Sequence, residues 1–374
     1  MTRDGAASFW RGKRVLLTGH TGFKGSWLAI WLHRLGASVV GVSLPPQTTP
    51  NLFTEANVAS LCDSHFCDIR DRAGLAELIR VARPEIVLHL AAQPLVRAGY
   101  REPCETFASN VMGTVHVLDA LRGLAGVRVA VMVTTDKVYR ETTARASFRE
   151  DDALGGHDPY SASKAACEIV VGSYRDAFLS AQGVAVASAR AGNVIGGGDW
   201  SDDRLIPDAV RAWQAGEELV VRSPLATRPW QHVLEPLAGY LTLARELWHQ
   251  PALAGGYNFG PATGDAVAVR EVVELARRIY GGGAVRYGEG GDGPHESAWL
   301  SLNTDKARER LGVRPVWTLA DAVARTMAWY RAHDAHSAYG EHADARQLCD
   351  ADIADFERRL AGGGAVAETA DAAV

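Results

Sequence analysis

The sequence predicts an α/β protein in which a doubly wound parallel sheet carries a smaller, mixed α/β cap. Short apolar stretches alternate with helical stretches through the first half of the chain, and a glycine-rich turn follows the first apolar stretch. The alternation loosens after about Gly192. Strands separated by helices are typical of a parallel sheet that is covered by helices on both faces.

The expected elements follow one another along the chain. Arg14–Thr18 is a short apolar strand, and Trp27–Leu35 has the apolar spacing of a helix that ends at Gly36. Another strand is expected just before Asp68. Further strands are predicted at 38–44, 86–90, 127–133 and 184–189, and helices at 75–82, 106–121, 160–179 and 206–214.

The same pattern suggests two domains. We expect a dinucleotide-binding domain over 12–192, with 228–260 returning to it. A substrate-binding cap would then consist of 193–227 and 261–335. The last residues, 361–374, are rich in Ala and Gly and have few large side chains, which predicts a disordered tail.

Composition narrows the class of protein. The 374 residues include 39 basic and 44 acidic side chains, and this net charge of −5 argues against a nucleic-acid partner. The five cysteines form no Cys-x-x-Cys pair, so we expect reduced thiols and no metal site. Met1–Arg14 lacks the apolar core of a signal peptide, and the longest apolar run, Val129–Val133, is far below the roughly 18 residues of a membrane helix. These features predict a soluble, cytoplasmic protein with no membrane partner.

A glycine fingerprint lies between the first strand and the first helix. Residues 18–25 read Thr-Gly-His-Thr-Gly-Phe-Lys-Gly. In this context backbone N–H groups and the helix N-terminus can hold a pyrophosphate, and the alternative is an ordinary glycine turn. Three glycines in register favour a Rossmann-type cofactor site. Its expected residues are Gly19, Thr21, Gly22, Phe23, Lys24 and Gly25.

Two later segments support a dinucleotide. Asp68 and Ile69 follow the expected third strand, where a carboxylate and its neighbouring backbone would meet adenine. The strand 86–90 is followed by Ala91 and Ala92, whose small side chains would let a cofactor lie flat against the chain. The acid that usually holds the NAD ribose about 20 residues past the glycines is absent, so NAD is expected and NADP stays open. The further cofactor contacts expected here are Ala91, Ala92, Gln93 and Asn110.

A Tyr-x-x-x-Lys motif lies in the predicted helix 160–179. Its spacing places Tyr160 and Lys164 on one helix face. A lysine ammonium beside a tyrosine favours the phenolate and so lowers the tyrosine pKa. Such a tyrosine can take a hydroxyl proton while hydride leaves to nicotinamide.

The glycine fingerprint and this motif together resemble the extended short-chain dehydrogenase/reductases, the NAD-dependent epimerase/dehydratase family. The resemblance runs from about Arg14 to Tyr330. It implies that a hydroxyl residue at the end of the fourth strand, Thr135 or else Thr134, joins the Tyr160/Lys164 pair.

The two residues after Thr135 distinguish the branches of this family, and here they are Asp136 and Lys137. Sugar epimerases usually carry no acid–base pair here, and nucleotide-sugar 4,6-dehydratases carry Asp followed by Glu. Asp136 followed by Lys137 resembles the branch that dehydrates CDP-glucose. After oxidation at C4, Lys137 would remove the C5 proton and Asp136 would protonate the departing 6-hydroxyl. The alternative is a solvated turn with a weak ion pair.

The resemblance also implies a substrate end. Asn193 would contact the sugar diphosphate, and Arg204 would contact the nucleotide half of the substrate. Arg228 would form a bidentate contact with the diphosphate. Trp230 or His232 would lie near the nucleoside. The alternatives are surface salt bridges for the arginines and a core position for Trp230.

The expected activity is therefore conversion of CDP-glucose to CDP-4-keto-6-deoxyglucose and water. Another nucleotide-sugar dehydratase or epimerase on the same scaffold stays open, as does a non-catalytic dinucleotide sensor, against which the intact Tyr160 and Lys164 argue. The resemblance implies a homodimer or a dimer of dimers, formed through helices 106–121 and 160–179.

Overall fold

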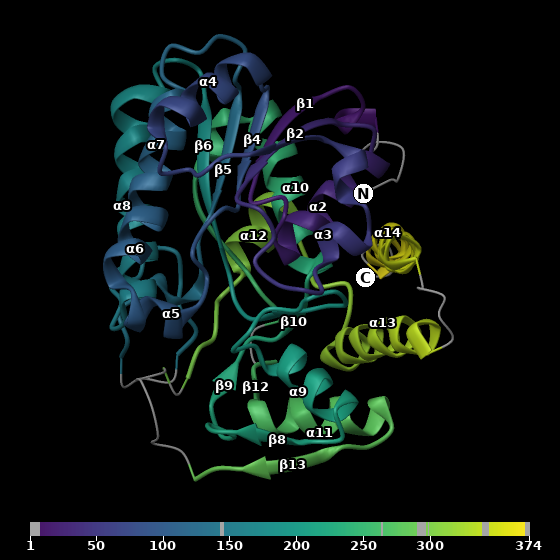
Figure 1. Ribbon diagram of the computed structural model, residues 1–374. Helices are drawn as coiled ribbons and strands as arrows, with labels where there is room; N and C mark the ends of the chain where they lie inside the picture. Colours follow the sequence, from purple (N-terminus) through teal and green to yellow (C-terminus); the bar gives the residue numbers. More distant parts are fainter. Residues whose placement is uncertain are drawn as a thin grey trace.

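A seven-stranded parallel sheet forms the centre of the computed structural model, which describes residues 8–142, 146–262, 265–289, 297, 299–338 and 344–370. The strand order is β11-β6-β5-β4-β1-β2-β3. The predicted doubly wound parallel sheet is confirmed (Figure 1). The strands are β1 (Arg14–Thr18), β2 (Ser38–Ser43), β3 (Asp63–Phe66), β4 (Ile86–His89), β5 (Val129–Val133), β6 (Ala185–Ala191) and β11 (Gly255–Phe259).

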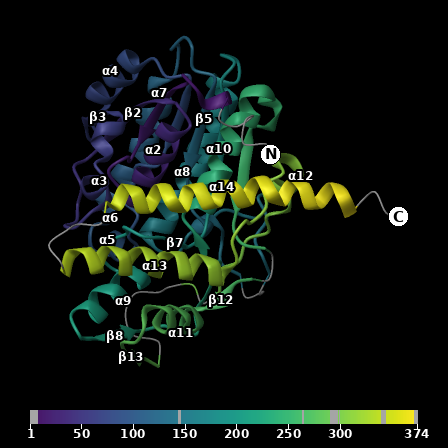
Figure 2. The same cartoon turned by 90° about the vertical axis from the view of Figure 1, so that its right-hand side faces the viewer.

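Helices cover both faces of this sheet. One face carries α4 (Arg72–Ala82), α7 (Gly113–Ala120) and α8 (Pro159–Tyr174). The other carries α2 (Phe23–Arg34) and α10 (Leu234–His249), with α14 (Ala345–Ala370) packed outside α2 (Figure 2). Because both faces are buried, the central strands β1, β4 and β5 are nearly continuous apolar runs in the sequence.

Shorter helical segments link these elements. The predicted helix 106–121 is observed as α6 (Pro103–Phe107), a π-helical turn (Ala108–Met112) and α7. The predicted helix 160–179 is α8 followed by another π-helical turn (Arg175–Leu179). The remaining short segments are α3 (Leu52–Glu55), α5 (Val96–Arg101) and the 3₁₀ turns Val58–Leu61, Asp136–Val138 and Pro251–Leu253.

A smaller layer lies beyond the carboxyl ends of the strands (Figure 1). It is built around α9, which packs on β8, and α11, which packs on α9 and α13. Between these elements the chain returns to the sheet through α10 and β11. The cap elements are α9 (Leu205–Gln214), β8 (Glu218–Val221), β9 (Thr227–Arg228), β12 (Val267–Ala268), α11 (Val269–Tyr280) and β13 (Ala284–Tyr287).

Three further segments join the cap to the sheet domain. Strands β7 (Val194–Ile195) and β10 (Gln231–His232) pair in parallel, and α13 (Leu319–Ala338) packs against both and against α11. Helix α12 (Asp305–Leu311) falls within the range expected for the cap but packs on β11 and α10. Its placement differs from the expectation because Ala307 and Leu311 are buried in the core on that side of the sheet.

The C-terminal segment also differs from the sequence prediction. The expected disordered tail, 361–374, is helical as far as Ala370, where α14 ends, and 371–374 lie outside the described residues. Extending an existing helix requires no new nucleation, and alanine is the best helix former, so these small residues continue α14. Among the described helices, none is long and apolar enough to cross a membrane.

Candidate active site

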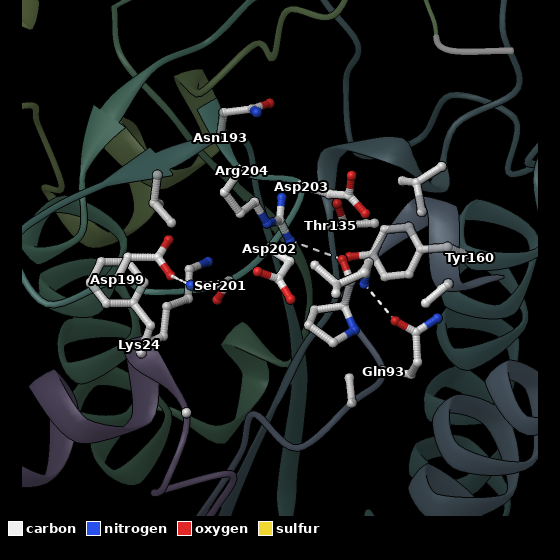
Figure 3. Close-up of a pocket in the computed structure, with 18 of the residues that line it drawn as sticks. Lys24, Gln93, Thr135, Tyr160, Asn193, Asp199, Ser201, Asp202, Asp203 and Arg204 are labelled. Carbon is white, nitrogen blue, oxygen red and sulfur yellow. Dashed lines mark hydrogen bonds between the residues drawn. The ribbon is translucent and has the colours of Figure 1, made fainter. Parts of the chain in front are cut away.

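A cavity of about 1060 Å³ opens at the carboxyl ends of the strands, between the sheet and the cap. Open α/β sheets bind ligands where the strand order reverses, which is here between β1 and β4. The turn after β1, the ends of β4 and β5, the start of α8 and the loop after β6 line the cavity. Figure 3 shows three side chains that approach it from the start of α2, the start of α8 and the residue before α9: Lys24, Tyr160 and Arg204.

The turn between β1 and α2 has no room for side chains at two of its glycines. Gly19 has φ +80°, and a Cβ there would lie 2.7 Å from the backbone nitrogen of Ala91. A Cβ on Gly25 would lie 2.0 Å from the carbonyl oxygen of Gly19. Gly22 is the N-cap of α2 and no side chain caps this helix, so the first N–H groups remain available to an anion. The turn therefore fits the pyrophosphate of a dinucleotide.

The loop after β4 is held by Asn110. The Gln93 N–H donates to Asn110 Oδ1 (2.8 Å), and Asn110 Nδ2 donates to the carbonyl of Gln93 (3.1 Å) and to Ser163 Oγ (2.9 Å). Ala91, Ala92 and Gln93 line the cavity, but Asn110 does not. The prediction that Asn110 contacts the cofactor differs from this geometry, because both ends of its amide are used to hold the loop against α8.

Asp68 and Ile69 line the cavity where β3 ends. The Asp68 carboxylate accepts from the backbone N–H of Arg70 (2.8 Å) and from its Nε (2.9 Å). These side-chain hydrogen bonds lower the pKa of Asp68, so the group stays anionic. The Ile69 side chain packs against Gly113, where a Cβ would lie only 2.4 Å from Ile69 Cδ1. The pair therefore forms a rigid edge of the cavity.

Tyr160 and Lys164 are both buried on α8, whose N-cap Asp158 accepts from the N–H of Ser161. Lys164 Nζ donates to the carbonyl oxygen of Val133 at the end of β5 (3.1 Å), and burial lowers the pKa of Lys164. Burial raises the pKa of Tyr160 to about 12, against the opposing charge of Arg204 and a hydrogen bond with Thr135. The sequence predicts a lowered tyrosine pKa, and burial reverses that sign.

Thr135 is the N-cap of the 3₁₀ turn Asp136–Val138, which follows β5 after two residues. Thr135 Oγ1 donates to Asp136 Oδ1 (3.0 Å), and Lys137 Nζ lies 3.5 Å from the same oxygen. Asp136 is only 1% exposed, and its Oδ2 has no hydrogen-bond partner among the described residues. Burial lowers the pKa of Lys137, Asp136 opposes that shift, and Arg228 and Arg204 add to it. This burial argues against a solvated ion pair.

The opposite wall of the cavity carries Asn193, Arg204, Arg228 and Trp230. Arg204 donates to the carbonyl oxygen of Pro94 (2.9 Å), and Figure 3 shows its guanidinium pointing toward Tyr160. Arg228 is buried and donates to the carbonyl oxygen of Thr227. Asn193 Oδ1 and Trp230 Nε1 are buried without a hydrogen-bond partner among the described residues. Such orphaned groups indicate a polar ligand at this wall.

Comparisons with known proteins agree with this geometry. Residues 15–252 match the model of the NAD dependent epimerase/dehydratase family. The chain belongs to this family. A CDP-glucose 4,6-dehydratase from Salmonella typhimurium is 44% identical over 331 residues, which are 87% of this chain and 92% of that protein. A UDP-glucose 4-epimerase from Mycolicibacterium smegmatis is 28% identical over 330 residues, covering 85% and 98%.

Solved structures of the epimerase/dehydratase family have the same fold. The dTDP-glucose 4,6-dehydratase of Streptomyces venezuelae, solved with NAD bound, has a TM-score of 0.72 and 26% identity, over 85% of this chain and 96% of that one. The family is NAD dependent, and the glycine turn described above fits that cofactor.

Two further residues differ from the sequence-based expectations. The sequence places Trp230 or His232 near the nucleoside. Trp230 lines the cavity, whereas His232 does not and lies in the core between Trp27 and Trp317. Burial lowers its pKa to about 3. Asp199 was not predicted, yet it is buried in the cavity wall, and Figure 3 shows it on the same side as Lys24. The only signal for Asp199 was its place after a run of three glycines.

Proposed function

We propose that this enzyme converts CDP-glucose to CDP-4-keto-6-deoxyglucose and water. The observation that carries the proposal is the pair of Asp136, which is buried, and Lys137, which is partly buried, shortly after β5 and close to Thr135 and to the Tyr160/Lys164 helix. The 44% identity to a CDP-glucose 4,6-dehydratase supports the same substrate.

The oxidising half of the site consists of Tyr160, Thr135 and Lys164. NAD, which the glycine turn after β1 would hold, would supply the hydride acceptor for C4 and the hydride donor for C6 of the sugar. Tyr160 removes the proton of the 4-hydroxyl, and Thr135 shares a hydrogen bond with the same oxygen. The cationic Lys164 stabilises the phenolate, against the burial that raises the pKa of Tyr160.

The eliminating half consists of Asp136 and Lys137. A keto group at C4 acidifies the C5 proton, which Lys137 takes in its neutral form. Asp136, in its protonated form, gives its proton to the 6-hydroxyl as the C6–O bond breaks, and water leaves. Lys137 then returns the proton to C5. Asp136 Oδ2, which has no hydrogen-bond partner within the described part of the chain, is the atom we assign to the 6-hydroxyl. The lowered pKa of Lys137 makes its neutral form accessible.

The remaining cavity residues would hold the CDP portion. Arg204 and Arg228 supply cations for the diphosphate, and Asn193 and Trp230 offer polar atoms that have no protein partner among the described residues. Lys24 lies in the same cationic site, where burial and Arg204 lower its pKa to about 8. Binding of an anionic substrate would raise the pKa of Lys24 again and so favour its charged form.

The test is incubation of the purified protein and NAD with CDP-, UDP-, dTDP- and GDP-glucose. We expect the 4-keto-6-deoxy product from CDP-glucose, with no net reduction of NAD. Formation of a C4 epimer without loss of water would instead support the epimerase alternative. Cofactor binding with no turnover of any sugar would support the sensor.

We also propose that the enzyme forms at least a dimer. The outer faces of the α6–α7 segment and of α8 expose large apolar side chains, and these helices pack on one another. The exposed residues are Phe107, Met112, Ile169 and Phe178. Light scattering at micromolar concentration should give twice the monomer mass or a multiple of it. A wild-type monomer would refute the proposal, and Ile169→Glu should weaken the assembly.

A further inference from the structure

A buried carboxylate lies one helical turn after Lys164. Glu168 is 7% exposed and accepts three hydrogen bonds, from Thr134 Oγ1 (2.5 Å), Ser188 Oγ (2.6 Å) and Arg190 Nη2 (2.8 Å). These donors come from β6 and from the residue that directly follows β5. One side chain therefore connects α8 to the ends of two neighbouring strands.

Arg190 extends this network to the far side of the Asp136–Lys137 turn. Its Nη1 donates to Tyr139 Oη (2.8 Å) and to the carbonyl oxygen of Glu150 (2.9 Å). Tyr139 directly follows the 3₁₀ turn, so the turn is tethered at both of its ends. The guanidinium needs the glycine at 256, where a Cβ would lie 2.9 Å from Nη2.

We propose that Glu168 is a positioning residue that fixes the Asp136–Lys137 turn relative to Tyr160 and Lys164. The inference rests on the proposed function, in which the two pairs act on adjacent carbons of one sugar. Both pairs must then keep a constant separation while the substrate passes from oxidation to elimination. Displacement of a reacting group by about 1 Å can reduce a rate by about 10²-fold.

The contacts at the end of β5 show why the Thr134 hydroxyl matters. The backbone of this segment has two other anchors, from Lys164 Nζ to the carbonyl of Val133 and from the Thr134 N–H to the carbonyl of Ala189. Both lie before the turn begins, and of the three hydrogen bonds to Glu168 the one from the Thr134 hydroxyl is nearest to Thr135 in the chain. The Glu168 charge also opposes the effect of burial on the pKa of Lys164, which helps to keep that amine charged.

The test compares Thr134→Val, which removes the hydroxyl at similar volume, with Thr134→Ser, which keeps it. Glu168 itself is not replaced, because its loss would leave the buried Arg190 without its counter-ion and would destabilise the fold. We expect Thr134→Val to lower kcat about 10-fold with KM changed by less than about two-fold, and to accumulate reduced cofactor during turnover. Thr134→Ser should recover most of kcat. Ser188→Ala, which also removes one hydroxyl bond to Glu168, is the control for lost stability.

The outcomes separate this inference from the proposed function. A folded wild-type enzyme that does not dehydrate CDP-glucose refutes the proposed function. An active wild type with equal kcat values in Thr134→Val, Thr134→Ser and Ser188→Ala refutes the positioning role alone. The positioning role is also refuted if Thr134→Val and Ser188→Ala lose kcat in the same proportion to their loss of melting temperature. A bond that only stabilises the fold would give this result.

Discussion

Alanine at Gly25 should damage the protein itself, whereas alanine at Gly22 should damage only cofactor binding. A Cβ on Gly25 would lie 2.0 Å from the Gly19 oxygen, 2.7 Å from the Gly19 carbonyl carbon and 2.8 Å from His20 Cα. All three are backbone atoms, so no side chain can rotate away. At Gly22 the nearest atom is the Gly19 oxygen at 3.4 Å, which is ordinary van der Waals contact.

These distances set the expected magnitudes. Since real Cβ contacts below 3.0 Å essentially do not occur, the Gly25→Ala backbone must move by about 1 Å. Overpacking of this kind lowers the free energy of unfolding by about 3 kcal/mol, which corresponds to a melting temperature lower by about 6 °C or more. Gly22→Ala changes only an N-cap glycine, and its melting temperature should stay within about 2 °C of wild type.

Cofactor binding should separate the two variants further. Gly22 lines the cavity at the start of α2, so a methyl group there occupies space next to the free N–H groups. Loss of one charge-assisted hydrogen bond, about 1.5–3 kcal/mol, corresponds to NAD affinity weaker by at least about 10-fold. Thermal unfolding without cofactor and calorimetric titration with NAD measure the two effects. Wild-type NAD affinity in Gly22→Ala, or wild-type stability in Gly25→Ala, would refute this reasoning.

The other predictions concern the reacting groups. Tyr160→Phe should lower kcat by about 10²-fold while NAD still binds, and near-normal turnover would remove Tyr160 from its role. Asp136→Asn should accumulate reduced cofactor, seen by absorbance, because loss of the 6-hydroxyl slows; dehydration at the wild-type rate would exclude Asp136 as the acid. Lys137→Met should abolish solvent-deuterium exchange at C5, and Lys137→Glu should restore part of it. Because burial lowers the pKa of Lys137 and its neutral amine is the base, exchange in wild type should rise with pH below the ordinary lysine pKa of about 10.4; a rate that falls over that range would contradict the assignment.

The sequence predicted the sheet and much of the cavity because their signals are local. The first strand, Arg14–Thr18, has the predicted bounds, because a short apolar run followed by glycine is enough to predict a strand and its end. The glycine turn, the end of β5 and the start of α8 all lie at strand or helix ends. In a parallel sheet these ends meet at one edge, so their residues share a cavity.

Other features depended on packing between distant segments. His232 is enclosed by Trp27 and Trp317, which are far from it in the chain, and its own neighbours in sequence could not reveal this. Asn110 is turned away from the cavity by its bonds to Gln93 and Ser163. The raised pKa of Tyr160 follows from burial, which the Tyr-x-x-x-Lys spacing does not encode.

The most direct test of the proposed reaction uses CDP-glucose labelled with deuterium at C4. If Tyr160 and Lys164 serve oxidation and Asp136 and Lys137 serve elimination in one cavity, the label should be found at C6 of the product. In deuterated water with unlabelled substrate, C5 should gain one solvent deuteron. Retention of the label at C4 of a sugar that keeps its 6-hydroxyl, or loss of the label to free cofactor, would contradict the account.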